Sequence, residues 1–156
     1  MRIKLILNGK TQKAYLLEGI AIYEKRLKHY CSFEQLIIPS VKAAAMTVEQ
    51  LKEKEAELII KHIDNTDFLV LLDENGKQYS SVDFAEFIQK QQLASLKNLV
   101  FVVGGPFGFA ESVYKRSNLK LSLSKMTFSH QMIRLLFIEQ LYRAYTIIKG
   151  EKYHHE

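Results

Sequence analysis

Basic side chains are mixed with aromatic rings and histidines near the C-terminus. The residues concerned are Arg134, Arg143, Lys149 and Lys152, together with Tyr142, Tyr145, Tyr153, His130, His154 and His155. Cationic groups bind phosphates and flat rings stack on bases, so this mixture is typical of proteins that contact nucleic acid. A solvated helix face is the alternative interpretation of the charges alone.

A glycine-rich segment, Gly104-Gly-Pro-Phe-Gly108, follows an apolar run and precedes a short helical pattern. Glycines at such a place let a ligand approach the backbone and permit positive φ angles. The segment does not match G-x-G-x-x-G, because Pro106 and Phe109 occupy the later glycine positions, and no Gly-Lys-Ser/Thr follows as in a P-loop. The alternative is a turn without a ligand, which Pro106 makes stiff.

A third candidate segment joins the last predicted strand to the last predicted helix. It consists of Leu123, Ser124, Lys125, Met126, Thr127 and Phe128, followed by Ser129 and His130. Apolar walls of this kind can hold a nucleoside ring while backbone groups bind its edge. The alternative is that the segment only caps the next helix through Ser129.

The remaining polar candidates are weaker. Asp73 and Glu74 follow a predicted strand and are interpreted as solvated loop acids. No carboxylate or cysteine stands at metal-ligand spacing from the histidines, and Cys31 is the single cysteine, so we expect no metal site.

The elements that must position these segments alternate along the chain. Apolar runs predict strands, and amphipathic segments between them predict helices, of which the second opens with a capping box of Thr47 and Gln50. The predicted strands are Ile3–Leu7, Leu36–Ile38, Phe68–Leu72, Leu99–Val103 and Leu119–Leu123. The predicted helices are Gln12–His29, Thr47 to about His62, Ser80 or Ser81 to Leu93, a short helix between Phe109 and Asn118, and Gln131–Ile148.

This alternation predicts an α/β fold with a mainly parallel sheet flanked by helices. Ligands bind such sheets beyond the carboxyl ends of the strands, which selects the loops after Leu72, Val103 and Leu123. The predicted helix Gln131–Ile148 is apolar around most of its circumference, so it must be buried on more than one side. We therefore expect a self-complementary dimer interface on it, the alternative being a helix sandwiched within one chain.

Length and composition limit the class of protein. The 156 residues fit one domain, 1–156, and the 47% apolar and 25% charged residues are ordinary for a globular protein. Both ends of the chain are basic and its middle is acidic, which favours a polyanionic partner. No apolar run is long enough for a membrane span or a signal peptide, so we expect a cytoplasmic protein.

Four motifs occur in an order that resembles a known family. They are Gly104-Gly-Pro-Phe-Gly108 after a buried strand, Ser122-Leu-Ser-Lys-Met-Thr-Phe-Ser-His130, Glu139-Gln-Leu-Tyr-Arg143-Ala and the terminal Tyr153-His154. Together they resemble the ribosomal RNA large subunit methyltransferase H family, a group of small SPOUT-class enzymes. The resemblance covers the whole chain. Phe107 departs from it where a polar residue is common, and His155 departs where Arg or Lys often stands.

The resemblance implies a C-terminal trefoil knot, an obligate homodimer and S-adenosyl-L-methionine as the methyl donor. It also implies that the acceptor is N3 of a pseudouridine in large-subunit (23S) ribosomal RNA, in the assembled ribosome. The donor pocket would use Leu72, Gly104 and Leu123 through Phe128. The RNA side would use His130, Arg134 and Tyr153, with Arg143 and His154 as the catalytic candidates and the tail reaching the pocket of the partner subunit.

Two other functions remain open on the residues alone. The first is a nucleotide- or dinucleotide-binding enzyme on an ordinary open sheet, against which the failed glycine fingerprints count. The second is a non-catalytic RNA-binding module, for which the basic ends would suffice but which needs no Gly-Gly-Pro pocket.

Overall fold

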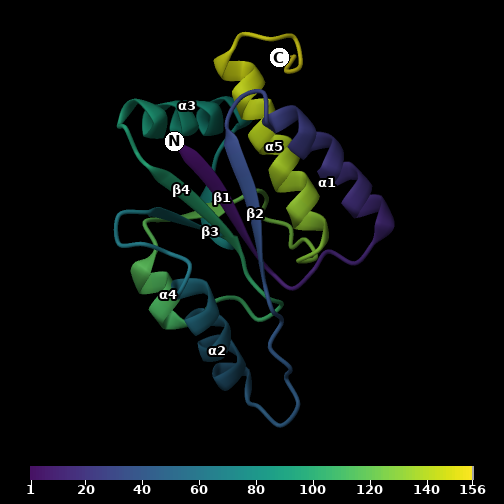
Figure 1. The fold of residues 1–156 in the computed structure, drawn as a ribbon, viewed down its shortest axis with the longest axis vertical. Coiled ribbons are helices and arrows are strands. Elements are labelled where there is room, and N and C mark those ends of the chain that lie inside the picture. The colour runs from purple at the N-terminus through teal and green to yellow at the C-terminus, as the bar shows by residue number, and fades with distance from the viewer. Residues whose placement is uncertain (156) are drawn as a thin grey trace.

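Five strands and five helices alternate along the chain in the computed structural model, which describes residues 1–155 (Figure 1). The strands are β1 (Arg2–Asn8), β2 (Ser32–Ile38), β3 (Phe68–Gln78), β4 (Asn98–Val103) and β5 (Leu119–Ser122). The helices are α1 (Ala14–Leu27), α2 (Val48–Ile60), α3 (Ser81–Leu93), α4 (Glu111–Arg116) and α5 (Met132–Ile148). All ten predicted elements are present, although β2 begins four residues before the predicted Leu36 and β3 continues six residues past Leu72.

The strands form one sheet in the order β2-β1-β4-β3-β5, and every pairing is parallel. The predicted α/β fold with a parallel sheet is therefore confirmed. β4 lies in the middle of the sheet and is apolar on both faces, as expected for a strand covered by helices on both sides. Since all strands run the same way, the segments that follow Leu72, Val103 and Ser122 lie at one edge of the sheet, and the first of them is the irregular continuation of β3 rather than the loop that the sequence predicted.

Local sequence signals explain where two of the helices begin. The Thr47 side chain accepts a hydrogen bond from the backbone N–H of Gln50, and the Gln50 side chain accepts one from the N–H of Thr47. Ser80 and Asp83 make the same reciprocal pair at the start of α3. Each pair satisfies two backbone donors that the first helical turn leaves free, so both predicted caps are confirmed.

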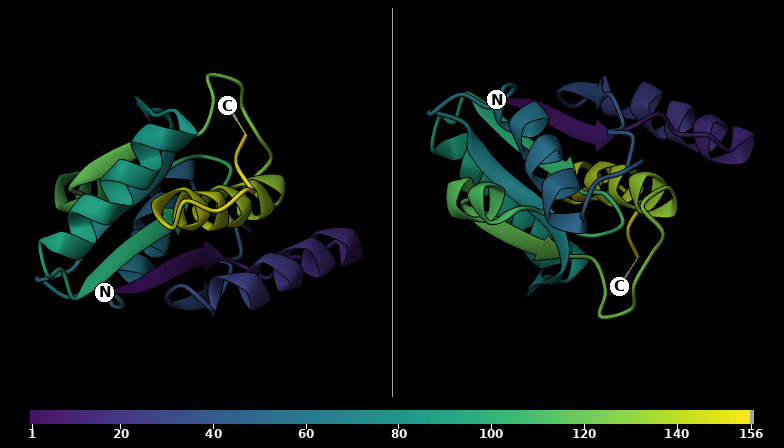
Figure 2. Two further views of the ribbon diagram at one scale, coloured as in Figure 1. Left: turned by 90° about the horizontal axis from the view of Figure 1, so that it is seen from above. Right: turned by 90° about the horizontal axis from the view of Figure 1, so that it is seen from below.

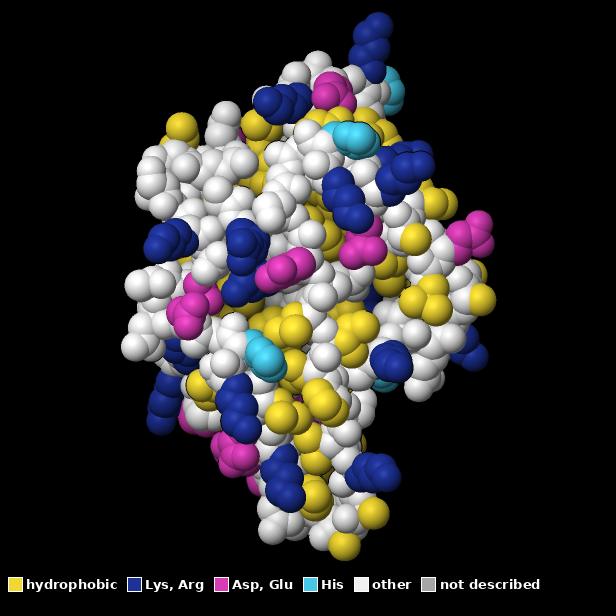
Figure 3. Space-filling model, in the orientation of Figure 1, with side chains coloured by type: hydrophobic (Ala, Val, Ile, Leu, Met, Phe, Trp, Pro, Cys, Tyr) yellow, Lys and Arg dark blue, Asp and Glu magenta, His cyan; other side chains and the backbone are white. Residues whose placement is uncertain are grey.

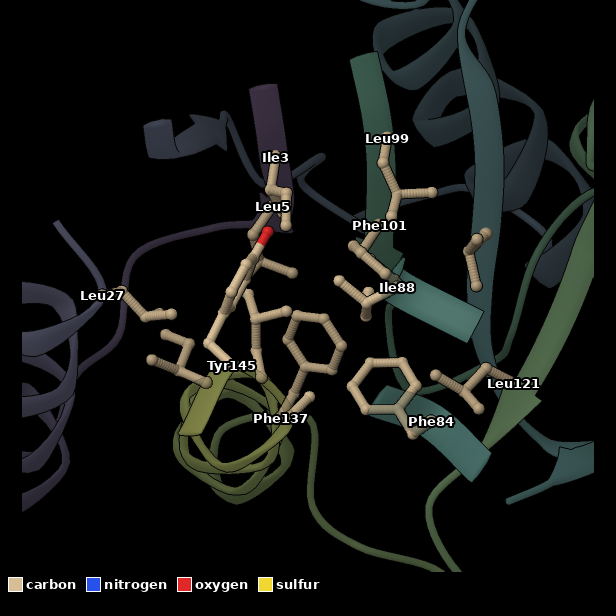
Figure 4. Close-up of a cluster of buried hydrophobic side chains, with 14 of the residues drawn as sticks. Ile3, Leu5, Leu27, Phe84, Ile88, Leu99, Phe101, Leu121, Phe137 and Tyr145 are labelled. Atoms are coloured by element: carbon tan, nitrogen blue, oxygen red, sulfur yellow. The ribbon is translucent and has the colours of Figure 1, made fainter. Parts of the chain in front are cut away.

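Helices cover both faces of the sheet. Helices α1, α3 and α5 lie on one face, whereas α2 and α4 lie on the other (Figures 1 and 2). The larger core lies under α5, where the rings of Phe101 and Phe137 are 4.7 Å apart and Phe84 packs beside both (Figure 4). This core anchors α5 rigidly against β4 in the centre of the sheet.

A single chain buries one side of α5, including Phe137, Leu141 and Tyr145. The helix packs between α1 and α3 on the sheet face, and none of its residues is fully exposed. Other apolar residues of the helix, among them Ile133 and Leu135, are only half-buried, so part of its apolar circumference stays accessible. The dimer interface expected on this helix therefore stays a prediction, because α1 and α3 cover its flanks and leave the rest of its apolar surface open.

On the face shown in Figure 3, Lys and Arg side chains are spread among acidic ones, and hydrophobic side chains are exposed over β2 and α2. Ile37, Val48 and Ile60 are among the exposed hydrophobic residues. In the part of the chain that the structure describes, no helix is long and apolar enough to cross a membrane. The same residues include no group of three or more His, Cys, Asp or Glu arranged to hold a metal ion.

Candidate functional site

A cavity of about 420 Å³ opens at the carboxyl edge of the sheet. Its walls come from the ends of β3, β4 and β5 and from the start of α5. These include the three loops that the sequence selected, although they lie far apart along the chain. The volume falls within the range of pockets that hold a cofactor or a drug-sized ligand.

The residues assigned to the donor by resemblance are nearly all in the cavity wall. Those that line it are Leu72, Gly104, Leu123, Ser124, Met126, Thr127 and Phe128. Lys125 does not line it, and its side chain is exposed instead. His130, assigned to the RNA side, also lines the cavity, and burial together with the neighbouring Arg134 lowers its pKa. A neutral His130 ring is therefore favoured near physiological pH.

Side chains pack closely against the backbone of the glycine turn after β4. A Cβ atom on Gly104 would lie 2.9 Å from the ring of Phe109, and one on Gly105 would lie 3.0 Å from a carboxylate oxygen of Glu55. Gly108 has a φ of 77°, which glycine adopts without strain. Side chains are thus excluded at these positions, and the backbone itself forms the cavity wall.

The loop after β5 is tied down by its hydroxyl groups. The Ser122 hydroxyl donates to the carbonyl oxygen of Ser124 at 2.8 Å, and the Ser124 hydroxyl accepts from the N–H of Met126 at 2.9 Å. The Thr127 hydroxyl donates to a carboxylate oxygen of Glu74, which links this loop to the end of β3. Ser129 accepts from the N–H of Met132 at 3.0 Å, but the N-cap of α5 is Gln131, whose side chain makes no capping bond, so the expected Ser129 cap lies in the turn before the helix.

Three polar residues of the cavity wall were missed or undervalued. Asp73 and Glu74 line the cavity, and Tyr114 donates a hydrogen bond of 2.6 Å to Asp73. Burial and this carboxylate raise the pKa of Tyr114 to about 12, so the phenol stays protonated. Asp73 and Glu74 had been interpreted as solvated loop acids, but the extension of β3 to Gln78 places them beside the ligand space. Their position directly after an apolar strand was the available signal.

The structure corrects the assignment of Arg134. This residue was expected to contact RNA, but its side chain is fully buried. Its guanidinium donates to the carbonyl oxygens of Asn8 at 2.8 Å and Gly9 at 2.9 Å, to the Thr11 hydroxyl at 3.0 Å and to the carbonyl of His130 at 2.9 Å. Arg134 therefore fastens the start of α5 to the end of β1 and has no free face for a phosphate.

The other catalytic and RNA-binding candidates form a separate cluster at the far end of α5. Arg143 makes an ion pair of 2.6 Å with Glu139, and the Tyr153 hydroxyl donates to the same carboxylate oxygen at 3.1 Å. The Arg143 guanidinium also lies 4.8 Å from the centre of the Tyr153 ring and 3.4 Å from Nδ1 of His154. These contacts bring the predicted residues Arg143, Tyr153 and His154 together.

One chain does not bring this cluster to the cavity. Ile133, in the cavity wall, and Arg143 are ten residues apart on one straight helix, which corresponds to about 15 Å along its axis. Figure 1 shows the C-terminus at the opposite end of α5 from the sheet edge with the cavity. A single chain therefore contains both parts of the candidate site, the cavity and the Arg143 cluster, but keeps them apart.

Known proteins are similar to this chain in sequence and in fold. A sequence model of the family described as "Predicted SPOUT methyltransferase" matches residues 1–154. Over at least 99% of both chains, the sequence is 59% identical to ribosomal RNA large subunit methyltransferase H of Christiangramia forsetii, 55% to that of Parabacteroides distasonis and 53% to that of Cytophaga hutchinsonii. A solved structure of a probable methylase family protein from Haemophilus influenzae is similar in fold, with a TM-score of 0.51 and 13% identity, over 97% of this chain and 67% of that one.

Proposed function

Because the chain belongs to the SPOUT methyltransferase family, we propose that it transfers a methyl group from S-adenosyl-L-methionine to N3 of a pseudouridine in large-subunit (23S) ribosomal RNA, in the assembled ribosome. The observation that carries the proposal is the cavity that three distant loops build at the carboxyl edge of the sheet. The relatives named as ribosomal RNA large subunit methyltransferase H, which match along the whole chain, support the RNA class of the substrate. An enzyme acting on ribosomes would work in the cytoplasm.

The residues of the cavity fit the donor. Leu72, Leu123 and Met126 offer apolar surface for a nucleoside, and Gly104 leaves backbone groups accessible. The carboxylates of Asp73 and Glu74 suit a ligand that carries positive charge. When bound, the donor supplies a methyl group on a positively charged sulfur, so the protein mainly has to align the acceptor and exclude water.

The acceptor side would use His130, Tyr153, Arg143 and His154. An arginine side chain only donates hydrogen bonds, so its contact with His154 requires Nδ1 of His154 to accept and Nε2 to carry the proton. In this arrangement His154 offers a donor toward the base. To act as a general base it must first lose the contact with Arg143, and Arg143 then remains as the cation that stabilises a deprotonated N3.

We propose a homodimer in which the tail of one chain reaches the cavity of the other. The proposal rests on the separation of the cavity from the Arg143 cluster along α5. A single folded chain holds both parts, and a second copy would supply the missing half of each site. Sedimentation at micromolar concentration is expected to give twice the mass of the 156-residue chain, and a monomer would contradict this proposal.

We also propose that the C-terminal part of this single domain forms a trefoil knot. After β5, at one margin of the sheet, the chain crosses to the end of β1, where Gln131 accepts a hydrogen bond of 2.9 Å from the N–H of Gln12. β3 and β4 lie between these two strands. A stable domain fused to the C-terminus should slow refolding more than the same domain fused to the N-terminus. The reason is that the C-terminal end must pass through a loop of the chain to form the knot. Equal rates would contradict the knot.

The donor site can be tested by calorimetric titration with S-adenosylhomocysteine, beside NADH and ATP. Binding of S-adenosylhomocysteine alone is the expected result. Binding of NADH or ATP instead would favour a nucleotide enzyme, and binding of none would favour a non-catalytic RNA module. Methyl transfer to unmodified ribosomes, with the product nucleoside identified by mass spectrometry, then tests the acceptor.

The catalytic cluster can be tested with His154→Ala. This variant should slow methylation of ribosomes while the affinity for S-adenosylhomocysteine stays within about twofold of the wild type. His154 is not among the residues that line the cavity, and the proposed dimer uses it on the acceptor side of the partner's site, which is why the affinity for the donor should hold. Loss of donor affinity would refute a purely catalytic role.

A further inference from the structure

Two phenylalanines of the glycine turn have opposite environments. Phe109 is buried beneath the turn, where its ring meets that of Tyr114 edge-on at 5.8 Å. Phe107, two residues earlier, lines the cavity and is 54% exposed. The core therefore needs Phe109, whereas Phe107 presents a large apolar ring to solvent at the cavity. Unlike a single apolar side chain on open surface, an exposed ring in the wall of a cavity is placed where a ligand can cover it.

The backbone around Phe107 is held in place. The N–H of Gly108 donates to the carbonyl oxygen of Gly105 at 3.2 Å, which closes a tight turn, and Pro106 restricts the φ angle inside it. Gly104 and Gly105 are packed from below by Phe109 and Glu55. A ring on a fixed turn loses little conformational entropy on binding, so it makes an efficient stacking platform.

The loop after β5 adds two more exposed apolar side chains to the same cavity. Met126 is 76% exposed and Phe128 is 38% exposed, and both line the cavity together with Phe107. Lys125, next to Met126, is exposed and stays outside the cavity wall. These side chains suit the two parts of one nucleotide. The flat base would lie on the apolar side chains at the cavity, and the phosphate would contact the lysine just outside it.

We infer that Phe107 is the stacking platform for the acceptor base, with Met126, which also borders the proposed donor pocket, contributing a second apolar contact and Lys125 a phosphate contact. The inference rests on the proposed function, because a base that is methylated here must leave its own stack and reach the donor cavity. Base–aromatic stacking replaces the stacking that the base loses in the RNA. Phe107 is thus a substrate-binding residue that selects an unstacked base.

The test is steady-state methylation of unmodified ribosomes by Phe107→Ala, Phe107→Leu and Phe107→Tyr, with S-adenosylhomocysteine affinity measured in parallel. The alanine and leucine variants should lose about 5- to 150-fold in kcat/KM for ribosomes, the range of one base–aromatic stack. The tyrosine variant keeps a flat ring and should retain activity. Leu93→Ala, which removes an 80% exposed apolar side chain at the end of α3, is the matched control and should change nothing.

Three results would overturn this inference. Unchanged kcat/KM in Phe107→Ala would show that the ring does not bind the base. A parallel loss of S-adenosylhomocysteine affinity would assign the ring to the donor, and a change of oligomeric state would assign it to a second copy of the chain. Failure of the proposed function looks different, because the wild-type protein would then transfer no methyl group to ribosomes, and this inference would fall with it.

Discussion

Replacement of Arg134 by Met distinguishes a buried anchor from an RNA contact. The guanidinium makes four hydrogen bonds to acceptors in the β1–α1 connection and at the start of α5. Bonds of this kind to a charged group contribute about 1.5–3 kcal/mol each. Burial of the charge offsets much of this sum, and the same burial lowers the pKa of Arg134. Met keeps the volume but leaves the acceptors unsatisfied.

We expect Arg134→Met to lower the free energy of unfolding by about 3–5 kcal/mol, as for other broken buried charge networks. That is a large fraction of the roughly 5–15 kcal/mol of a typical domain. Urea denaturation at matched protein concentration measures the change, since association shifts the apparent stability. Arg2→Met, at an exposed residue of β1, is the control and should stay within about 0.5 kcal/mol.

The opposite result would refute the reasoning. Suppose that Arg134→Met lowered the free energy of unfolding by less than about 1 kcal/mol while its affinity for ribosomes fell. The guanidinium would then be an RNA contact, and the buried arrangement would not represent the working protein. If Arg134→Met lowers the urea midpoint and Arg2→Met leaves it unchanged, the role of Arg134 as a buried anchor is confirmed.

Three further predictions concern the space beneath the glycine turn and the thiol. Gly105→Ala should weaken S-adenosylhomocysteine binding at least about tenfold, because its Cβ would lie 3.0 Å from Glu55 and 3.2 Å from Asn8; unchanged calorimetric affinity would contradict this. Burial raises the pKa of the Glu55 carboxyl above its ordinary value, so folding favours the neutral carboxyl more than the unfolded chain does. The wild type should therefore lose stability relative to Glu55→Gln as pH rises through the range just above 4.5, and parallel urea midpoints from pH 4 to 7 would disprove it. Burial also raises the pKa of Cys31 to about 11, so iodoacetamide at pH 8 should alkylate the native protein about a hundredfold more slowly than the unfolded chain.

The strands and helices were predictable because their signals are local. A fully apolar run such as Leu99–Val103 and a capping box such as Thr47 with Gln50 need no knowledge of the fold. The edge strand β2 was recognised only in its last part, because its exposed side interrupts the apolar pattern. The strand order is a long-range property that no local pattern contains.

Part of the candidate site was predictable from the sequence, and part was not. The three loops of the cavity followed from the rule that ligands bind at the carboxyl ends of parallel strands. The role of Arg134 did not follow, because an arginine for RNA and an arginine for buried carbonyls look alike in a sequence. How far one chain buries α5 also could not be predicted, since its burial depends on how α1 and α3 flank it.

The length of α5 between the cavity and the Arg143 cluster has a genetic consequence in the proposed dimer. A chain with a damaged cavity and a chain with a damaged tail would each be inactive alone. Mixed in equal amounts, about half of the dimers would contain one chain of each kind, and each of these would have one site that joins the sound cavity of one chain to the sound tail of the other. Two defective alleles would then complement each other in one cell, whereas two alleles with defects in the same half would not.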